Sequence, residues 1–79
     1  MQRYGKDGLT IRERDIYMYI VKFMNIKGYS PTINEIAIGV ITSRSFVRHV
    51  LYKLEEKGFI TFEKHKRRTI TITNHKQIS

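Results

Sequence analysis

Cysteine is absent from the 79-residue sequence, which excludes disulfides and thiolate metal sites. Long apolar runs are also absent: none approaches the ~18–20 residues of a membrane-spanning helix, and residues 1–8 hold no signal-peptide core. A chain this short forms one domain and buries only about 60–65% of its unfolded surface, which leaves no room for a deep catalytic cleft. We expect an intracellular protein that is cytoplasmic and nucleoid-associated.

Residues that could carry catalysis or hold a cofactor are sparse. The three histidines, His49, His65 and His75, have neither a carboxylate nor a second histidine at metal-ligand spacing. Ser43 and Ser45 lie near His49 but lack an orienting acid, and the five glycines form no phosphate-binding loop. We therefore predict no enzyme activity, no metal site, no cofactor and no small-molecule ligand.

Acidic residues are scarce as well. Seven Asp and Glu oppose 15 Lys and Arg, so the formal net charge is +8. An excess of positive charge in a small chain points first to a polyanionic partner, usually a nucleic acid. The alternative is a basic, well-solvated surface without such a partner.

Two helices are predicted in the first part of the chain. Thr10 and Thr32 each stand three residues before a glutamate, which is the spacing of a capping box. Gly28 ends the first helix, whereas Gly39 and the β-branched residues 40–42 break the second after about two turns. The expected buried faces are Ile16, Tyr19, Ile20 and Phe23 in the first helix, and Ile33, Ile36 and Ala37 in the second.

A third helix and a hairpin are predicted to follow. The helix begins near Thr42 or Ser43 and runs to Lys57, and Gly58 stops it. Its inward stripe is Val47, Val50, Leu51 and Leu54. After Gly58 the hydrophobic period changes from 3.6 to 2. Strands are expected over 59–63 and 68–73, joined by a polar turn over 64–67.

This order of elements predicts an α+β fold that is mainly α. A short helix followed at once by a longer one is the helix-turn-helix arrangement, and the basic hairpin after it would be the wing. We expect a winged helix-turn-helix domain over 9–73, with flexible segments over 1–8 and 74–79.

The third helix is the predicted recognition helix, because its outward face holds no acid before Glu55 and Glu56. A helix fits the major groove of double-stranded DNA, where Arg48 could donate two hydrogen bonds to guanine. Phe46 either touches a thymine methyl group or joins the core. The predicted DNA-binding residues here are Ser43, Arg44, Ser45, Phe46, Arg48, His49, Tyr52 and Lys53.

The hairpin turn is the second predicted DNA-binding region. Four basic residues within five positions suit phosphate contacts or insertion into a narrow minor groove. The alternative is a charged turn that prevents edge pairing of the sheet. Free amides at the helix starts near Thr32 and Ser43 would add phosphate contacts. The predicted residues of the turn are Lys64, Lys66, Arg67 and Arg68, with His65 among them.

Several motifs of the sequence occur together in one family. They are Leu9-Thr10, Gly-Tyr-Ser-Pro-Thr at 28–32, Glu35-Ile36-Ala37, the pair Leu51 and Leu54, Leu-Glu-Glu-Lys-Gly-Phe-Ile at 54–60, and Arg68. With them, the stretch from Leu9 to Ile72 resembles the N-terminal DNA-binding domain of the LexA repressor. The motif at 54–60 alone is shared by many winged-helix regulators, including MarR-like ones.

The resemblance implies a winged helix that binds operator DNA and regulates transcription as a repressor. It places Ser43, Ser45, Phe46, Arg48 and His49 in the base-reading stretch. The link between Ala37 and Ser43 is about one residue shorter than in the family, and the usual glycine is absent or displaced to Gly39. The 79 residues hold no counterpart of the self-cleaving peptidase domain, so no autoproteolysis follows. We expect an excised domain or a small regulator of the kind that phages and mobile elements carry.

The first helix holds more apolar residues than one buried face needs: Tyr17, Met18, Val21, Met24 and Ile26. This surplus keeps a second function open, a winged-helix module that docks a protein partner through this helix. It also suggests a homodimer through the exposed candidates Met18 and Val21, because one small module covers few base pairs and such regulators usually bind DNA in pairs.

Overall fold

All three helices begin where their capping residues predict. A computed structural model describes residues 8–73; the predicted flexible segments lie outside this range except at Gly8. The Thr10 hydroxyl accepts from the Glu13 N–H at 3.1 Å, and the Glu13 carboxylate accepts from the Thr10 N–H at 3.0 Å. Thr32 and Glu35 repeat this pattern, and Ser43 caps the third helix. The helices are α1 (Ile11–Lys27), α2 (Ile33–Val40) and α3 (Arg44–Glu56).

The hairpin that follows is shorter than the sequence predicts. Strands β1 (Ile60–Thr61) and β2 (Thr71–Ile72) pair antiparallel, with Ile60 opposite Ile72. The expected strands over 59–63 and 68–73 were wrong in length, because residues 62–70 form a loop closed by a side chain. The Thr69 hydroxyl accepts from the Glu63 N–H at 2.9 Å, and His65 and Arg68 have positive φ, which interrupts the extended backbone.

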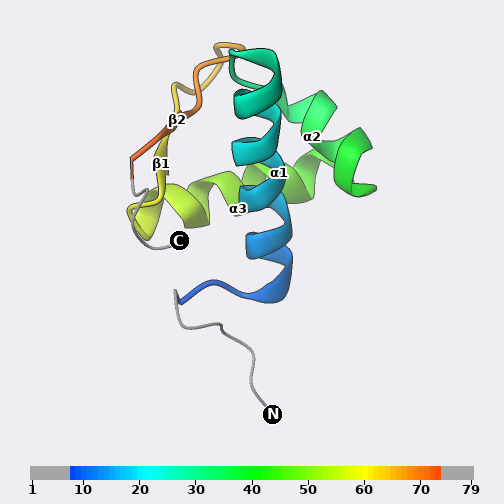
Figure 1. The fold of residues 1–79 in the computed structure, drawn as a ribbon. Coiled ribbons are helices and arrows are strands. Elements are labelled where there is room, and N and C mark those ends of the chain that lie inside the picture. Colours follow the sequence, from blue (N-terminus) through cyan, green and yellow to red (C-terminus); the bar gives the residue numbers. More distant parts are fainter. Residues whose placement is uncertain (1–7, 74–79) are drawn as a thin grey trace.

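The elements surround one core, and the predicted winged helix-turn-helix class is confirmed. In Figure 1, α1 crosses in front of α3, α2 lies on one side of it, and the hairpin lies on the other. The buried stripe of α3, Val47, Val50, Leu51 and Leu54, is as predicted. The rest of the core is Leu9, Ile16, Tyr17, Ile20, Ile36, Ala37, Phe59, Ile60 and Ile70.

The buried face of α1 differs from the predicted one. Tyr17, expected among the surplus apolar residues, is buried, and its ring packs edge-on against Phe59 at 5.3 Å between centroids. Tyr19 and Phe23 are only half-buried. Val21, expected to be exposed, is half-buried and packs against the core. The exposed surplus residues are therefore Met18 and Ile26.

The turn between α2 and α3 also departs from expectation. Gly39 was predicted to break α2, yet it lies inside the helix. A Cβ at this position would overlap the ring of Tyr19. The role of Gly39 is close packing of α2 on α1. The left-handed residue that ends α2 is Ile41, with φ 58°, which is an unfavourable conformation for a β-branched side chain. Thr42 N–H then donates to the Ala37 carbonyl, and Ser43 starts α3.

The hairpin is fixed to the start of α2 by one guanidinium group. Arg68 donates to both carboxylate oxygens of Glu35, at 2.9 and 3.0 Å, and to the Ser30 carbonyl at 3.0 Å. The guanidinium carbon of Arg68 lies 4.8 Å from the ring centroid of Tyr29. The buried Ser30 hydroxyl accepts from the Ile70 N–H at 3.1 Å. The segment around Ile70 is thereby held against the segment around Ser30, which lies 40 residues earlier in the sequence.

Two glutamates that form ion pairs, Glu13 with Lys57 and Glu35 with Arg68, have a lowered carboxyl pKa. The hydrogen bond from Arg68, helped by the one from the Thr32 N–H, lowers the pKa of Glu35. Burial raises the pKa of Glu13, but hydrogen bonds from Lys57 and Thr10 together outweigh it, so the pKa of Glu13 is lowered overall. Lys57 Nζ lies 2.7 Å from the Glu13 carboxylate and 2.9 Å from the Gly8 carbonyl oxygen, which joins α1 to the end of α3.

The packing of Gly39 predicts that Gly39→Ala destabilises the protein. Alanine in an exposed helix normally gains about 1 kcal/mol over glycine, whereas overpacking against Tyr19 should cost about 1–3 kcal/mol. Chemical denaturation would measure the free energy of unfolding. Introduced in a Tyr19→Ala background, the same substitution should be neutral or stabilising, because the ring is gone. A stabilising Gly39→Ala in the presence of Tyr19 would refute the packing role.

The Glu35–Arg68 ion pair predicts a loss of stability in acid. Because folding lowers the pKa of Glu35 below its ordinary value of 4.5, its contribution is present above that value and is lost as pH falls through the folded-state pKa. Between about pH 5 and pH 3, the free energy of unfolding should fall less steeply for Glu35→Gln than for the wild type. Glu55→Gln is a matched control on α3. Equal slopes for wild type and Glu35→Gln would contradict the role of this pair.

Candidate nucleic-acid interface

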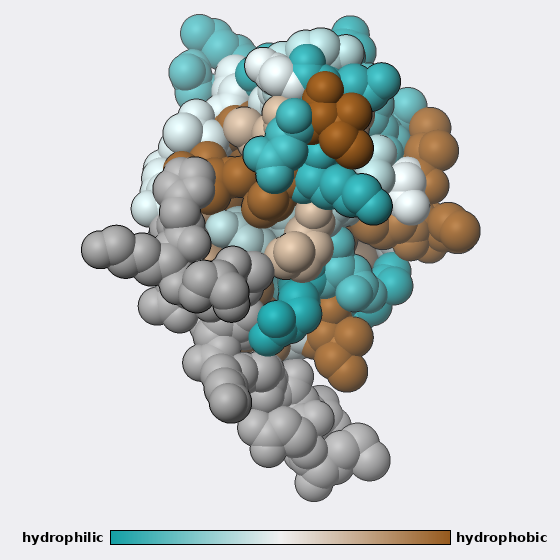
Figure 2. Space-filling view, viewed as in Figure 1, coloured by the Kyte–Doolittle hydropathy of each residue, from teal (hydrophilic) through white to brown (hydrophobic). Residues whose placement is uncertain are grey.

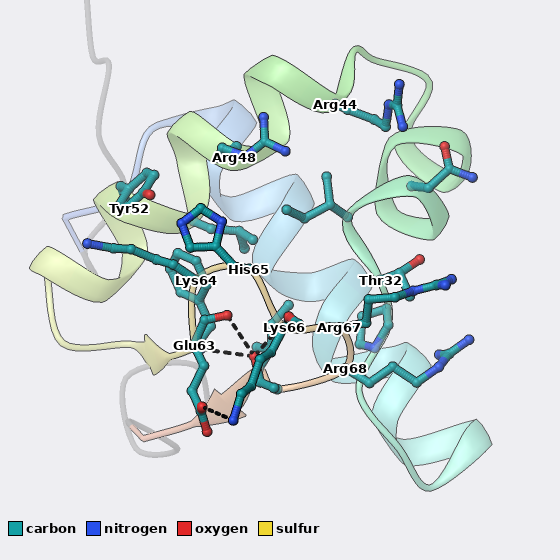
Figure 3. A pocket seen from close by; sticks show the side chains of 17 residues that line it. Thr32, Arg44, Arg48, Tyr52, Glu63, Lys64, His65, Lys66, Arg67 and Arg68 are labelled. Atoms are coloured by element: carbon teal, nitrogen blue, oxygen red, sulfur yellow. Dashed lines mark hydrogen bonds and ion pairs between the residues drawn. The ribbon is translucent and has the colours of Figure 1, made fainter.

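One groove brings together basic side chains from three parts of the chain. It lies between α3, the start of α2 and the loop over 62–70. Figure 3 shows Arg44 and Arg48 projecting from α3, His65 facing Arg48 from the loop, Lys64 beside Tyr52, and Arg67 on the side of α2. The predicted site residues that line the groove are Thr32, Arg44, Arg48, Tyr52, Lys64, Lys66, Arg67 and Arg68.

The other predicted residues of α3 lie outside the groove. Ser43, Ser45 and His49 are exposed, and helix geometry places Ser45 and His49 on the side away from the buried stripe. Lys53 is half-buried, and its amino group lies 3.8 Å from the Glu56 carboxylate. Helix α3 therefore presents two surfaces, its outermost face and the flank that borders the groove.

Phe46 packs partly against the core, which is one of the two roles that the sequence left open for it. Its ring is half-buried and packs against the core cluster. The guanidinium of Arg12, from the first turn of α1, lies 5.6 Å from its ring centroid, and the His49 ring lies 6.4 Å away. Arg12 thus adds a cation beside the start of α3. Sequence reasoning missed it, because no local pattern indicates that the start of α1 meets α3.

The cations of the site differ in how they are held. Lys66 lies 3.3 Å from the Glu63 carboxylate at an exposed position, and Lys64 Nζ lies 5.1 Å from the ring centroid of Tyr52. Among residues 8–73, no ion pair or hydrogen bond engages the guanidinium groups of Arg44, Arg48 or Arg67. Three uncompensated guanidinium groups around one groove repel each other and favour a bound polyanion.

Arg68 differs from its basic neighbours. Its guanidinium is held by Glu35, Ser30 and Tyr29, so most of its donors are already engaged. Asn34, which follows the cap of α2, also lines the groove and was not predicted. A role for Asn34 in the site could have been suspected from the sequence. Side chains in the first turn of α2 lie beside the free backbone N–H groups of the helix start, which can bind a phosphate.

Two other classes of site find no support in the described part of the chain. Within residues 8–73, no three His, Cys, Asp or Glu side chains gather as a metal site would require. Over the same range, none of the helices has the length and apolar character needed to cross a lipid bilayer.

Comparison with known proteins agrees with this geometry. The LexA DNA binding domain family matches residues 6–69. The chain is 43% identical over 68 residues to the LexA repressor of Staphylococcus epidermidis, and 41% identical over 68 residues to those of Staphylococcus aureus strains Mu3 and N315. Each alignment covers 84% of this chain and 32% of the relative, so the chain spans about a third of the length of these relatives. Since the family covers most of the sequence and of the described fold, this chain belongs to the LexA DNA-binding domain family.

Proposed function

We propose that this chain is the double-stranded DNA-binding domain of a transcriptional repressor. The observation that carries the proposal is the gathering of Arg44, Arg48 and Arg67 around one groove without carboxylate partners among residues 8–73. The relatives, which are named LexA repressors, add the expectation of repression. The protein would act in the cytoplasm, where bacterial DNA lies.

In the proposed complex, α3 lies in the major groove. Ser45 and His49 occupy its outermost face, where side chains reach base edges. Arg48 lies one turn from Arg44 on the adjacent flank and has an unpaired guanidinium within the described residues. A guanidinium in this position donates two hydrogen bonds to guanine O6 and N7. Arg48 is therefore the proposed principal base-reading residue. The sugar–phosphate backbone of the DNA would be contacted by Ser43, Arg44, Tyr52 and Lys53.

The loop over 62–70 supplies the second contact in this proposal. Lys64, His65, Lys66 and Arg67 are all exposed, and they lie on the groove side of the hairpin. They would bind phosphates or enter the minor groove. We propose that Arg68 acts indirectly, because its pairing with Glu35 fixes the loop relative to α2. Thr32 and the amides at the start of α2 would bind a further phosphate.

A second candidate function is protein docking through α1. The observation in its favour is that Met18 is 41% and Ile26 is 68% exposed on the outer side of this helix. The predicted homodimer would use the same face, although the Val21 side chain is partly buried against the core. Both proposals leave the DNA-binding groove free. The domain limits of 9–73 also remain a proposal.

The proposed division of roles predicts different effects of Arg48→Ala and Arg67→Ala. Arg48→Ala should weaken binding to a preferred site by about 1–3 kcal/mol and change binding to random duplex little, because a base contact is lost. Arg67→Ala should weaken both alike and reduce the slope of log affinity against log salt by about one unit. Fluorescence anisotropy with a duplex selected from a random pool would measure both.

Two controls make the comparison decisive. Circular dichroism would verify that each variant is folded, and Lys27→Ala, at the far end of α1, tests whether loss of any positive charge suffices. Wild-type binding that is absent or independent of salt would refute DNA binding itself. If instead Arg67→Ala alters sequence preference and Arg48→Ala does not, the loop reads sequence and the proposed roles are reversed.

A further inference from the structure

A stripe of exposed residues runs along the outer side of α1. Ile11 and Ile26 are 69% and 68% exposed, and Met18 lies between them. Asp15 and Lys22 are exposed in the two gaps. In Figure 2, the line of α1 carries brown atoms near both ends with teal atoms between them. This set of five residues is here called the α1 seam.

The α1 seam is one face of the helix. Its members follow each other at intervals of three or four residues, which places them on one side of an α-helix. The buried residues of α1, Glu13, Ile16, Tyr17 and Ile20, lie on the opposite side. Nothing in the described part of the chain covers the seam. Spacing of this kind is that of the contact positions in paired helices.

The seam is complementary to itself when reversed. Ile11 and Ile26 are equally far from the midpoint between Met18 and Tyr19, and so are Asp15 and Lys22. In an antiparallel pair of helices, Ile11 of each copy would therefore lie against Ile26 of the other copy. The same arrangement would also place each Asp15 against a Lys22. A parallel copy would instead oppose like charges.

We propose that the α1 seam binds a second copy of this chain, with the two α1 helices antiparallel across a two-fold axis near Met18. An apolar groove beside the seam, lined by Tyr19, Val21 and Val40 among others, would receive Ile11 of the second copy. Asp15 is free to exchange partners, because its carboxylate is 4.0 Å from the Arg12 guanidinium at a half-exposed position. Two-fold symmetry forms both ion pairs at once.

The association would be weak. A contact between single helices of 17 residues buries less than the roughly 1,200 Å² of a stable interface. The net charge of +8 on each copy opposes pairing, and salt screens that repulsion. We therefore expect a reversible dimer that appears at high protein concentration.

The orientation of the dimer has a consequence for DNA, which rests on the proposed function. In Figure 1, α1 lies in front of α3, and the α1 seam lies on the side of α1 opposite to its buried residues. Two copies joined at the seam would present their basic grooves in opposite directions. Such a dimer would hold two duplexes, or two distant segments of one duplex, and not two adjacent half-sites.

Sedimentation equilibrium without DNA tests the seam over a wide range of protein concentration. Wild type should form a reversible dimer, whereas Asp15→Lys and Lys22→Asp should each weaken association by at least about tenfold, because like charges then face each other. An equimolar mixture of the two variants should recover association, since opposite charges again meet. Both positions are exposed, and circular dichroism checks that the variants are folded. Lys27→Asp is the control for net charge.

The outcomes separate the seam from DNA binding. A monomer at every concentration, or a mixture that associates no better than each variant alone, would overturn the proposed dimer whatever the DNA results. Restored association in the mixture would support the antiparallel arrangement specifically. Two duplexes with different dyes should then report energy transfer with wild type and not with Asp15→Lys. Dimerisation without such transfer would overturn only the bridging of duplexes.

Discussion

The groove depends on the ion pair between Glu35 and Arg68, because this pair sets where the hairpin loop lies relative to the helices. Glu35 accepts from the Thr32 N–H and from Arg68, so one carboxylate both starts α2 and holds the loop. The short ladder of Ile60–Thr61 with Thr71–Ile72 could not orient a loop of this length alone. The bidentate geometry of an arginine–carboxylate pair restricts the direction of the loop as well as its distance.

The basic residues of the chain therefore have two kinds of role, although the sequence presents them as one population. Lys57 and Arg68 meet carboxylates within the described fold and join elements distant in sequence. Arg44, Arg48 and Arg67 meet none there and are left for an external anion. Since only seven acids oppose 15 basic residues, the placement of each glutamate decides which cations are left over. Glu13 and Glu35 serve both as helix caps and as anchors, which leaves the groove without acids except Glu63.

Local chemistry could be predicted from the sequence, and long-range pairing could not. The capping boxes at Thr10 and Thr32 and the buried stripe of α3 follow from spacing alone, so the helices were predicted closely. The strands were predicted too long, because alternation does not reveal that Thr69 would close the loop by its hydroxyl. The partnership of Arg68 with Glu35, 33 residues earlier, leaves no trace in either local pattern. The density of positive charge in the sequence identified the basic turn, but it did not show that Arg68 is already paired with Glu35.

The turn of the helix-turn-helix places a glycine within a helix and a β-branched residue in the left-handed conformation. A glycine within a helix normally signals its end, but Gly39 lies within α2, where the ring of Tyr19 occupies the space that a Cβ would need. The helix continues past it to Val40, and the left-handed position needed to leave α2 is occupied by Ile41. Isoleucine in this conformation costs roughly 1–2 kcal/mol relative to glycine. Its side chain is 87% exposed, so burial does not repay that cost. The strain is tolerated because the contact of α2 with α1 and the cap at Ser43 fix both ends of the turn, and with them the angle at which α3 presents Arg48.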